Sequence, residues 1–376
     1  MIFFFKPQKK KILIYDASNS KLIVNYLYKK DYEVLYTRRE KFSLFIILKC
    51  LLKKKFSFRE YYVEYIKYVN PKLIITYVDN NPFFYELKNR LNIKTMFIQN
   101  GLRTAIGDSF QFVLNKNLKI FKKLKKKNFS VDYMLIWNDD LGRFLNKFIK
   151  GKYFSIGSFA NNFFYKENIK PKNDVIFISC SRFLSNQNAI LNGITYEDYI
   201  KNEKMFYFYL ENFCEENKLR LHILGKTNSN LEYQYFYKNF SKKFHFIPRT
   251  KDRNAYNILC DYKYIVTFDS SLGYEMLIKG KKVGFFSRFE QNVYPYKTIK
   301  FGWLQKIKNK GPFWTDKINK KEVYRILKFL INTKEDVWKN RIKNFALRLI
   351  NFDQNNSEFK KILSLEGIDS KNPKKR

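Results

Sequence analysis

Short apolar segments alternate with longer helical segments along the first half of the chain. Most of the apolar segments are followed closely by Asp, Asn or Gly, which is typical of buried parallel strands that end in turns. The six predicted strands are Ile12–Tyr15, Val34–Tyr36, Leu73–Val78, Met96–Ile98, Tyr133–Trp137 and Phe154–Ile156. Since helical stretches separate most of them, the pattern predicts a parallel sheet with helices on both faces.

The alternation restarts after a polar stretch, residues 161–173, which we interpret as a linker between two domains. Strands of the second half are predicted at Val175–Ser179, Leu219–Leu224, Phe244–Ile247, Tyr264–Phe268 and Lys282–Phe286. Its helices are predicted at Tyr196–Asn217, Arg253–Asp261, Leu272–Lys279, Lys320–Asn332 and Lys334–Leu349. The expected fold class is therefore α/β, with two Rossmann-like, doubly wound domains whose strand-end loops face a shared cleft.

The same pattern sets the expected domain boundaries. We place the first domain at residues 1–165 and the second at residues 166–350. Residues 351–376 are mostly polar and are expected to form a frayed tail, as chain ends often do.

The formal net charge of +39 on 376 residues changes the range of possible partners. Nucleic acid and an anionic membrane surface both attract such a chain. The lysines are dispersed over both halves of the chain. The chain is also rich in residues with A/T-rich codons, namely Lys, Asn, Ile, Phe and Tyr, so the base composition of the genome explains part of the charge. Dispersed charge without a recognised nucleic-acid-binding module argues against nucleic acid as the partner.

One apolar segment, Phe42–Leu52, is followed directly by Lys53, Lys54 and Lys55. Its 11 residues are fewer than the roughly 18–20 that a membrane-spanning helix needs. Two interpretations stay open: a helix that faces the core, which we favour, and a helix that docks on an anionic membrane surface.

The cysteines and the first residues of the chain indicate the cellular compartment in which the protein is expected. The four cysteines, Cys50, Cys180, Cys214 and Cys260, lie far apart without a CxxC pair, which suits reduced thiols. The start, Met1–Pro7, is too short an apolar stretch for a secretory signal. We expect a cytoplasmic protein, peripheral on the inner face of the cell membrane if the apolar segment docks there.

The clearest candidate for a ligand site is the turn Asp269–Glu275. A buried strand is expected to end at Asp269, and Ser270 and Ser271 to open the next helix. A helix start presents free N–H groups and the positive end of the helix dipole, which bind anions such as phosphate. This turn is therefore expected to bind a phosphorylated ligand.

Two further residues of this turn extend the hypothesis. Gly273 would let a ligand approach closely, and Glu275, one turn into the helix, would accept two hydrogen bonds from a ribose diol. The alternative is simple capping of the helix by Asp269 or Ser271. A capping box places Glu three residues after the cap, whereas Glu275 falls four residues after Ser271, so we favour ligand binding.

Polar residues also end two consecutive strands of the first domain. Asp79 and Asn100 would lie at the same sheet edge if their strands are neighbours, as sequential strands usually are. Asp79 is the candidate general base, with Asp108 in reserve, and Arg103 would hold a phosphate or carboxylate. The alternative is that these residues satisfy the backbone of their own turns.

In the second domain, Lys226 and Arg249 follow predicted strands and would face the phosphates of a ligand, although exposed cations are common. His222 lies within a strand and is expected to be a satisfied core residue. The sequence holds no GxxxxGK[ST] loop, no GxGxxG after a strand, no HExxH and no Cys/His cluster, so we expect neither a metal nor a cofactor.

The segment Ser270–Val283 resembles the nucleotide-binding half of GT-B glycosyltransferases, and specifically bacterial surface-carbohydrate (capsule and lipopolysaccharide) biosynthesis proteins. That family has a Ser-x-x-Gly-[Phe/Tyr]-Glu turn ahead of a Gly-Lys-[Lys/Pro]-Val strand. Other motifs similar to the family's extend over most of the chain: Asp79–Asn81, Ile98–Arg103, Ile156–Ser158, Phe301–Trp303 and Gly311–Trp314. The last two are expected to form an aromatic loop that stacks on a base or sugar, or covers the seam between the domains.

The resemblance implies that Ser270, Ser271, Gly273 and Glu275 bind a nucleotide. Relatives in capsule synthesis transfer Kdo, an acidic sugar, from its CMP-activated form, and carry an Asp nucleophile where this sequence has Asn100. A neutral amide is a very poor nucleophile, so Asn100 departs from the family's retaining mechanism.

The function implied is a metal-independent glycosyltransferase. It would move a sugar from a nucleotide-activated donor, a CMP-linked acidic sugar among them, to a surface polysaccharide or lipid-linked acceptor. Two alternatives stay open: a non-catalytic scaffold of polysaccharide assembly, and a transferase of glycerol phosphate from a CDP carrier.

Overall fold

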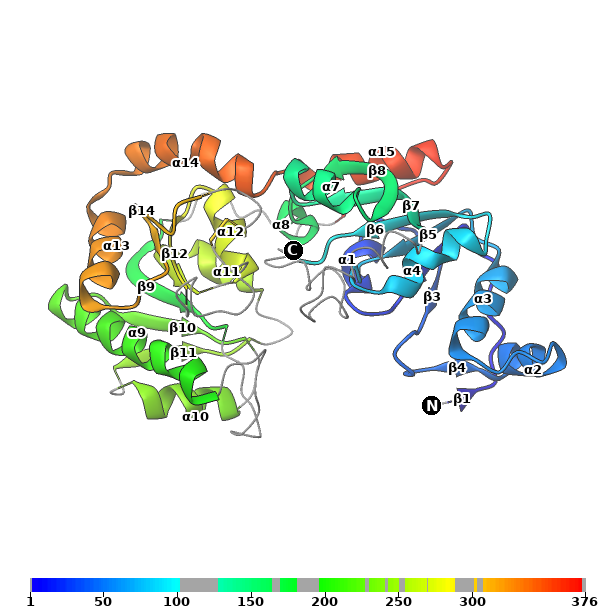
Figure 1. The fold of residues 1–376 in the computed structure, drawn as a ribbon, viewed down its shortest axis with the longest axis horizontal. Helices are drawn as coiled ribbons and strands as arrows, with labels where there is room; N and C mark the ends of the chain where they lie inside the picture. Colours follow the sequence, from blue (N-terminus) through cyan, green and yellow to red (C-terminus); the bar gives the residue numbers. More distant parts are fainter. Residues whose placement is uncertain are drawn as a thin grey trace. The chain divides into compact units, whose positions relative to one another are not determined.

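The computed structural model of the chain describes residues 2–101, 128–163, 170–180, 196–226, 230–240, 243–249, 254–268, 270–287, 301–302 and 307–373. The chain divides into two compact units, and the second is inserted into the first (Figure 1). Unit 1 comprises Met1–Phe163 and Asn351–Arg376, and unit 2 comprises Phe164–Ile350.

A six-stranded parallel sheet of order β3-β2-β5-β6-β7-β8 forms the centre of unit 1. Its strands are β2 (Ile12–Tyr15), β3 (Tyr32–Leu35), β5 (Leu73–Thr76), β6 (Lys94–Ile98), β7 (Phe129–Ile136) and β8 (Ile149–Ser155). The helices that accompany them are α1 (Ser20–Val24), α3 (Phe58–Val69), α4 (Pro82–Glu86) and its 3-10 extension (Leu87–Asn89), α7 (Asp139–Leu145) and α8 (Phe159–Phe163). The chain winds outward from β2 to β3 and then returns to β5 on its other side, which makes the sheet doubly wound, as predicted.

A small subdomain precedes α3 and was not predicted as sheet. Strand β1 (Ile2–Phe3) pairs in parallel with β4 (Phe42–Ser43), and β4 leads directly into α2 (Leu44–Leu52). The hydroxyl of Ser43 donates to the carbonyl of Phe5 at 2.5 Å, so the first residues of the chain are tied to the start of α2.

Unit 2 is built on a seven-stranded sheet of order β11-β10-β9-β12-β13-β15-β14. Its strands are β9 (Lys172–Ile178), β10 (Leu221–Leu224), β11 (Phe244–Ile247), β12 (Tyr262–Thr267), β13 (Lys282–Phe286), β14 (Lys310–Gly311) and β15 (Trp314–Thr315). The helices are α9 (Tyr196–Glu216), α10 (Asn230–Asn239), α11 (Ala255–Cys260), α12 (Ser271–Ile278), α13 (Lys320–Asn332) and α14 (Glu335–Leu349). All strand pairs are parallel except β14 with β15, so the predicted parallel α/β class is confirmed for this unit too.

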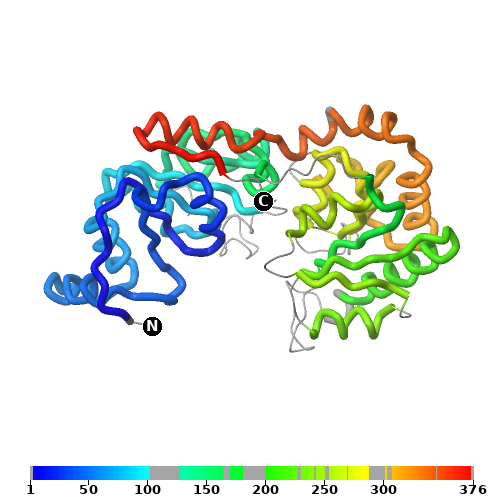
Figure 2. The backbone as a smooth tube through the Cα atoms, turned by 180° about the vertical axis from the view of Figure 1, so that it is seen from behind, coloured from blue at the N-terminus to red at the C-terminus, as the bar shows by residue number. Residues whose placement is uncertain are grey.

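The expectation of a frayed tail after residue 350 was wrong. The segment contains α15 (Ser357–Leu365), preceded by a 3-10 turn (Gln354–Asn356), and it packs on unit 1 (Figure 2). Helix α15 buries Phe359, Ile362 and Leu363, a spacing that places all three on one face. Apolar burial on unit 1 therefore orders a segment whose composition is mostly polar.

The prediction that residues 161–173 form a linker was also wrong, because both ends of this segment belong to regular elements. Asn161 and Asn162 are buried within α8, and Lys172 begins β9. The Nδ2 of Asn162 donates to the carbonyl of Ile156 at 2.8 Å, so these polar residues serve unit 1 rather than a solvated connection.

Candidate functional site

The carboxyl ends of the unit 2 strands form one edge of the sheet, and the pairing register aligns them. One row across five neighbouring strands consists of Ile247, Leu224, Ile178, Thr267 and Phe285. Lys226 and Arg249 each lie two residues beyond this row, and Ser270 lies three residues beyond it. The structure therefore brings both predicted cations and the start of α12 to the same edge.

The spacing of strands sets how far apart these groups are. Adjacent strands lie about 4.8 Å apart, so β10 is roughly 10 Å and β11 roughly 14 Å from β12. Lys226 is exposed and Arg249 is half-buried. The cations thus lie at increasing distance from the start of α12, an arrangement that suits an elongated anion lying along the edge.

Helix α12 begins at Ser271, with Ser270 as its cap. The Oγ of Ser270 accepts a hydrogen bond from the N–H of Leu272 at 3.3 Å, and the carbonyl of Ser270 accepts from the N–H of Gly273 at 3.0 Å. Asp269 lies outside the described residues. The predicted strand and helix are present, and the positive end of the α12 dipole faces the carboxyl edge.

Gly273 has a packing role that the sequence did not reveal. A Cβ at this position would lie 2.7 Å from Cγ2 of Thr267 and 2.9 Å from Cε1 of Phe285. Only glycine lets α12 approach β12 and β13 this closely, so helix packing accounts for Gly273 without a ligand.

Glu275 lies one turn into α12, and only 4% of its surface is exposed. Its negative charge acts on Lys279, one turn further on: burial lowers the pKa of Lys279 below its ordinary value, and Glu275 partly opposes this effect. The structure buries this carboxylate in the first half of α12, and the nearby Lys279 is an electrostatic partner that the sequence analysis did not consider.

A second buried carboxylate, Glu232, was missed. It lies in the first turn of α10 with no exposed surface, and its Oε1 accepts from Ser179 Oγ at 2.6 Å and from the N–H of Lys226 at 2.8 Å. Glu232 thereby joins the loops that follow β9 and β10 and fixes the backbone at Lys226. The available signal was its spacing four residues before Phe236, which places it on the buried face of α10.

The aromatic residues of the motifs Phe301–Trp303 and Gly311–Trp314 that the structure describes pack inside unit 2, against α12. Phe301 stacks on Trp314, with ring centroids 4.9 Å apart, and on Tyr274 of α12 at 5.5 Å. The hydroxyl oxygen of Tyr274 accepts from the N–H of Gly302 at 3.0 Å. Trp303 lies outside the described residues. The aromatic residues therefore support α12 from within unit 2. The sequence predicted either stacking on a base or sugar or covering the seam between the domains, and it did not predict this packing role.

The unit 1 sheet places Asp79 and Asn100 at one edge. Strands β5 and β6 are adjacent and parallel, and Thr76 pairs with Phe97, so each residue lies three positions beyond the same register row. Asp79 is 6% exposed, and its carbonyl accepts from the hydroxyl of Tyr85, whereas Asn100 is exposed. Arg103 and Asp108 lie outside the described residues.

Gln99 fixes the turn that carries Asn100. Its Oε1 accepts from the N–H of Trp137 at 2.9 Å, and its Nε2 donates to the carbonyl of Gly101 at 2.8 Å. Since Gln99 is 1% exposed, it acts as a buried clamp between β6, β7 and the turn. A single amide in a sequence gives no sign of such a role.

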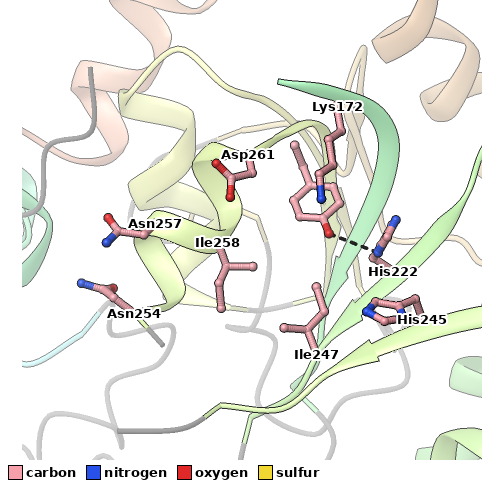
Figure 3. A pocket seen from close by; sticks show the side chains of 9 residues that line it. Lys172, His222, His245, Ile247, Asn254, Asn257, Ile258 and Asp261 are labelled. Atoms are coloured by element: carbon pink, nitrogen blue, oxygen red, sulfur yellow. Dashed lines mark hydrogen bonds between the residues drawn. The ribbon is translucent and has the colours of Figure 1, made fainter. Parts of the chain in front are cut away.

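A cavity of about 450 Å³ lies elsewhere in unit 2, beneath α11 (Figure 3). Its lining includes Lys172, His222, His245 and Tyr262, but none of the predicted site residues. The Nε2 of His222 is 3.2 Å from Oδ2 of Asp174, and its Nδ1 is 3.1 Å from the hydroxyl oxygen of Tyr262. Burial lowers the pKa of His222, and Asp174 partly opposes this, so His222 is the satisfied core residue that the sequence predicted.

Among the described residues, no group of three or more His, Cys, Asp or Glu is arranged as metal ligands would be. No helix of the described part of the chain is both long and apolar enough to cross a bilayer.

Comparison with known sequences identifies the family. Residues 96–366 match the sequence model of a family described as "putative O-antigen biosynthesis protein". This match covers more than half of the chain, which therefore belongs to that family of surface-carbohydrate biosynthesis proteins. No curated protein sequence matches the chain.

Solved structures of the same fold cover nearly the whole chain. The "putative UDP-N-acetylglucosamine 2-epimerase from Listeria monocytogenes" has 14% identity and a TM-score of 0.56, over 98% of this chain and 99% of that one. The UDP complex of S. aureus MnaA has 14% identity and a TM-score of 0.52, over 98% and 100%. The wall teichoic acid polymerase TagF soaked with CDPG has 13% identity and a TM-score of 0.53, over 96% and 89%. These similarities confirm the GT-B-like fold of two Rossmann-like domains.

Proposed function

We propose that this protein is a metal-independent transferase of surface-carbohydrate synthesis that moves a sugar from a nucleotide-activated donor to a polysaccharide or lipid-linked acceptor. The observation that carries the proposal is the carboxyl edge of unit 2, where the capped start of α12 and the cations Lys226 and Arg249 lie two or three residues beyond the same register row. Family membership and the GT-B-like fold support it.

The proposed donor site follows from the charges at this edge. The nucleotide phosphates would lie at the start of α12, where N–H groups and the helix dipole favour negative charge. Ser270 and Ser271 would add hydroxyl contacts, and Lys226 or Arg249 would stabilise the departing phosphate as it gains charge. Glu275 would accept hydrogen bonds from the ribose, and Asp269 would complete the turn.

The acceptor would bind at the carboxyl edge of unit 1. Asp79 is the proposed general base and Asp108 the reserve, while Arg103 would hold an anionic group of a substrate. A lipid-linked acceptor would require the protein to work at the inner face of the membrane. The donor sugar is left open, with a CMP-linked acidic sugar among the candidates.

A second candidate is a transferase of glycerol phosphate from a CDP carrier, and Asn100 favours it. A phosphoryl group can pass directly to an acceptor hydroxyl with the help of a base, so this reaction needs no glycosyl-enzyme bond and no carboxylate at position 100. A non-catalytic scaffold with the same fold is the remaining alternative.

The proposal is tested by a thermal-shift screen against CMP, CDP, UDP and GDP. A nucleotide at 100 times its Kd stabilises the protein by about 2.7 kcal/mol, hence raises Tm by roughly 5–10 °C. Glu275→Gln should lower the affinity for that nucleotide roughly 10–100-fold, because a charged hydrogen-bond acceptor is lost. Glu335→Gln, at the exposed start of α14, is the matched control and should leave the affinity unchanged.

The outcomes separate the alternatives. A shift with CDP or CMP, followed by consumption of only one donor class, distinguishes a sugar transferase from a glycerol phosphate transferase. If none of the four nucleotides raises Tm, the proposed donor site is wrong and the scaffold is the better account.

A further inference from the structure

Helix α2 has an apolar side that none of the described residues of unit 1 covers. Its inward positions, Ile46 and Cys50, are 0% and 5% exposed, and the helix packs on α3. Leu48, Leu51 and Leu52 are 47%, 49% and 85% exposed. These three lie at helical spacing on the opposite side, so α2 has apolar residues on two opposite sides while only one of them is buried.

More exposed apolar side chains surround the helix in the subdomain of β1, β4, α2 and the start of α3, which Figure 1 shows together. Phe4 is 80% exposed, Phe56 is 78%, and Phe3 and Phe58 are 39% and 49%. With the three leucines they form what we call the α2 surface. These seven side chains are almost half of the sixteen large exposed hydrophobic residues in the described part of the chain, so the apolar surface is concentrated here.

Cations are interleaved with these apolar residues. Residues 36–60 contain eight Lys or Arg and two Glu. The guanidinium of Arg39 lies over the ring of Phe58 at 4.7 Å, and Lys41 lies over the ring of Phe3 at 5.9 Å. Such side chains place their stems on apolar surface and keep their charges toward water, which suits a boundary between hydrocarbon and headgroups.

The turn after α2 is held in place by two ion pairs to one buried carboxylate. Lys53 and Lys55 contact Glu64 of α3 at 2.6 and 2.8 Å. Burial alone would raise the pKa of Glu64, but the two lysines outweigh it and lower the pKa, so Glu64 is ionised near neutral pH. This fixed turn presents Lys54 and Phe56 together to solvent.

We propose that the α2 surface is a docking site for a bilayer that carries anionic phospholipids. Protein–protein interface cores are depleted in Lys, whereas leucine and phenylalanine ringed by lysines are typical of helices that lie at the headgroup boundary. The leucines and Phe56 enter the boundary region, and Lys41, Lys49 and Lys54 meet the anionic headgroups. This inference goes beyond the proposed transfer reaction and does not depend on it.

Flotation with vesicles tests the proposal in the full-length protein. Binding to mixed phosphatidylglycerol and phosphatidylcholine vesicles is expected to exceed binding to phosphatidylcholine alone and to weaken as salt is added. Leu52→Glu combined with Phe56→Glu should lower the partition coefficient at least about tenfold, because two apolar anchors are lost. Lys54→Gln should lower it roughly fivefold.

Matched controls come from exposed residues elsewhere in the chain. Leu365→Glu, at a position 77% exposed at the end of α15, and Lys328→Gln, at an exposed position of α13, should leave vesicle binding unchanged. All variants should keep the parent Tm and nucleotide affinity, so a failure of this proposal is distinguishable from a failure of the proposed function.

Two results would overturn the proposal. The first is equal vesicle binding by the parent and by the Leu52/Phe56 double variant. The second is a concentration-dependent dimer, lost in the double variant, in a protein that binds no vesicles, which would assign the α2 surface to a second copy of the chain.

Discussion

Asn356 accepts a hydrogen bond at 2.9 Å from Nδ2 of Asn162, which lies 194 positions earlier in the chain. The Nδ2 of Asn356 donates to the hydroxyl oxygen of Tyr26 at 2.7 Å and to the carbonyl of Phe159 at 2.9 Å. Asn356 has no exposed surface, so one side chain joins α8 and the residues after α1 to the C-terminal segment.

We expect Asn356→Ala to destabilise the protein by about 2–4 kcal/mol, because it leaves several buried polar groups unpaired. Urea unfolding would measure the effect. Asn355→Ala is the control: Asn355 and Asn356 both have positive φ angles, 57° and 51°, but Asn355 is exposed. Similar losses of stability in the two variants would show that the effect comes from the positive φ angle of the backbone and not from the hydrogen bonds of Asn356.

Gly273→Ala should lower stability by about 1–3 kcal/mol, since the added Cβ meets Thr267 and Phe285 at distances that real contacts do not show. At an unconstrained helical site the same change stabilises by up to about 1 kcal/mol, so the sign of the change is informative. Calorimetry without nucleotide measures it. An unchanged or raised Tm with weaker nucleotide binding would restore the ligand-approach role predicted for Gly273.

Asp79→Asn should abolish transfer while nucleotide affinity survives, because an amide cannot act as the base. Donor turnover and calorimetric nucleotide binding are the two measurements. Asp369→Asn, at an exposed position of unit 1, is the matched control. Full activity in Asp79→Asn would show that Asp79 is not the general base.

The same mechanism predicts no covalent intermediate at Asn100. Intact-protein mass spectrometry after incubation with donor alone should show no sugar adduct, and Asn100→Asp should not be needed for activity. An adduct on the peptide Gln99–Arg103 would contradict direct displacement.

His222 predicts how stability depends on pH. Burial holds its pKa below 6.5 in the folded protein, so the unfolded chain binds more protons at mildly acidic pH. The stability that neutral His222 contributes is present above pH 6.5 and is lost as the pH falls through the lower, folded pKa. His222→Gln should flatten the dependence of Tm on pH in this range.

The chain has only one other histidine, which supplies the control. His245 is exposed, and its ring lies 5.4 Å from that of His222. His245→Gln should preserve most of the acid sensitivity. If it removes the sensitivity and His222→Gln does not, the Asp174–His222–Tyr262 network is not its source.

Much of the fold could be predicted because local signals agreed with the final packing. The bounds of β11, β13 and α13 match the predicted ranges, and α13 has a clear start, where the side chain of Asn319 accepts from the N–H of Glu322 at 2.9 Å. Helix α15 was missed although Phe359 and Ile362 have helical spacing, since its partners lie hundreds of residues earlier and the nearby residues are polar.

The candidate site was predictable in part. The strand, turn and helix at Ser270 follow from local pattern, whereas the alignment of Lys226 with Arg249 depends on strand order, which a single sequence does not contain. Glu232 was missed because a glutamate on the buried face of a helix contradicts the usual preference for exposure. The roles of Asp79 and Glu275 stay predictions.

The insertion of unit 2 into unit 1 also sets an order on synthesis. Residues 1–163 leave the ribosome before unit 2, whereas Asn356 and α15 leave it after unit 2. At about 5–20 residues per second, translation of residues 164–350 takes roughly 10–40 s. During that interval Tyr26 and Asn162 lack their hydrogen bonds to Asn356, which has not yet been translated. Unit 1 therefore completes its fold only after residues 351–373 have been translated, and loss of those residues would damage a domain whose larger part was made before unit 2.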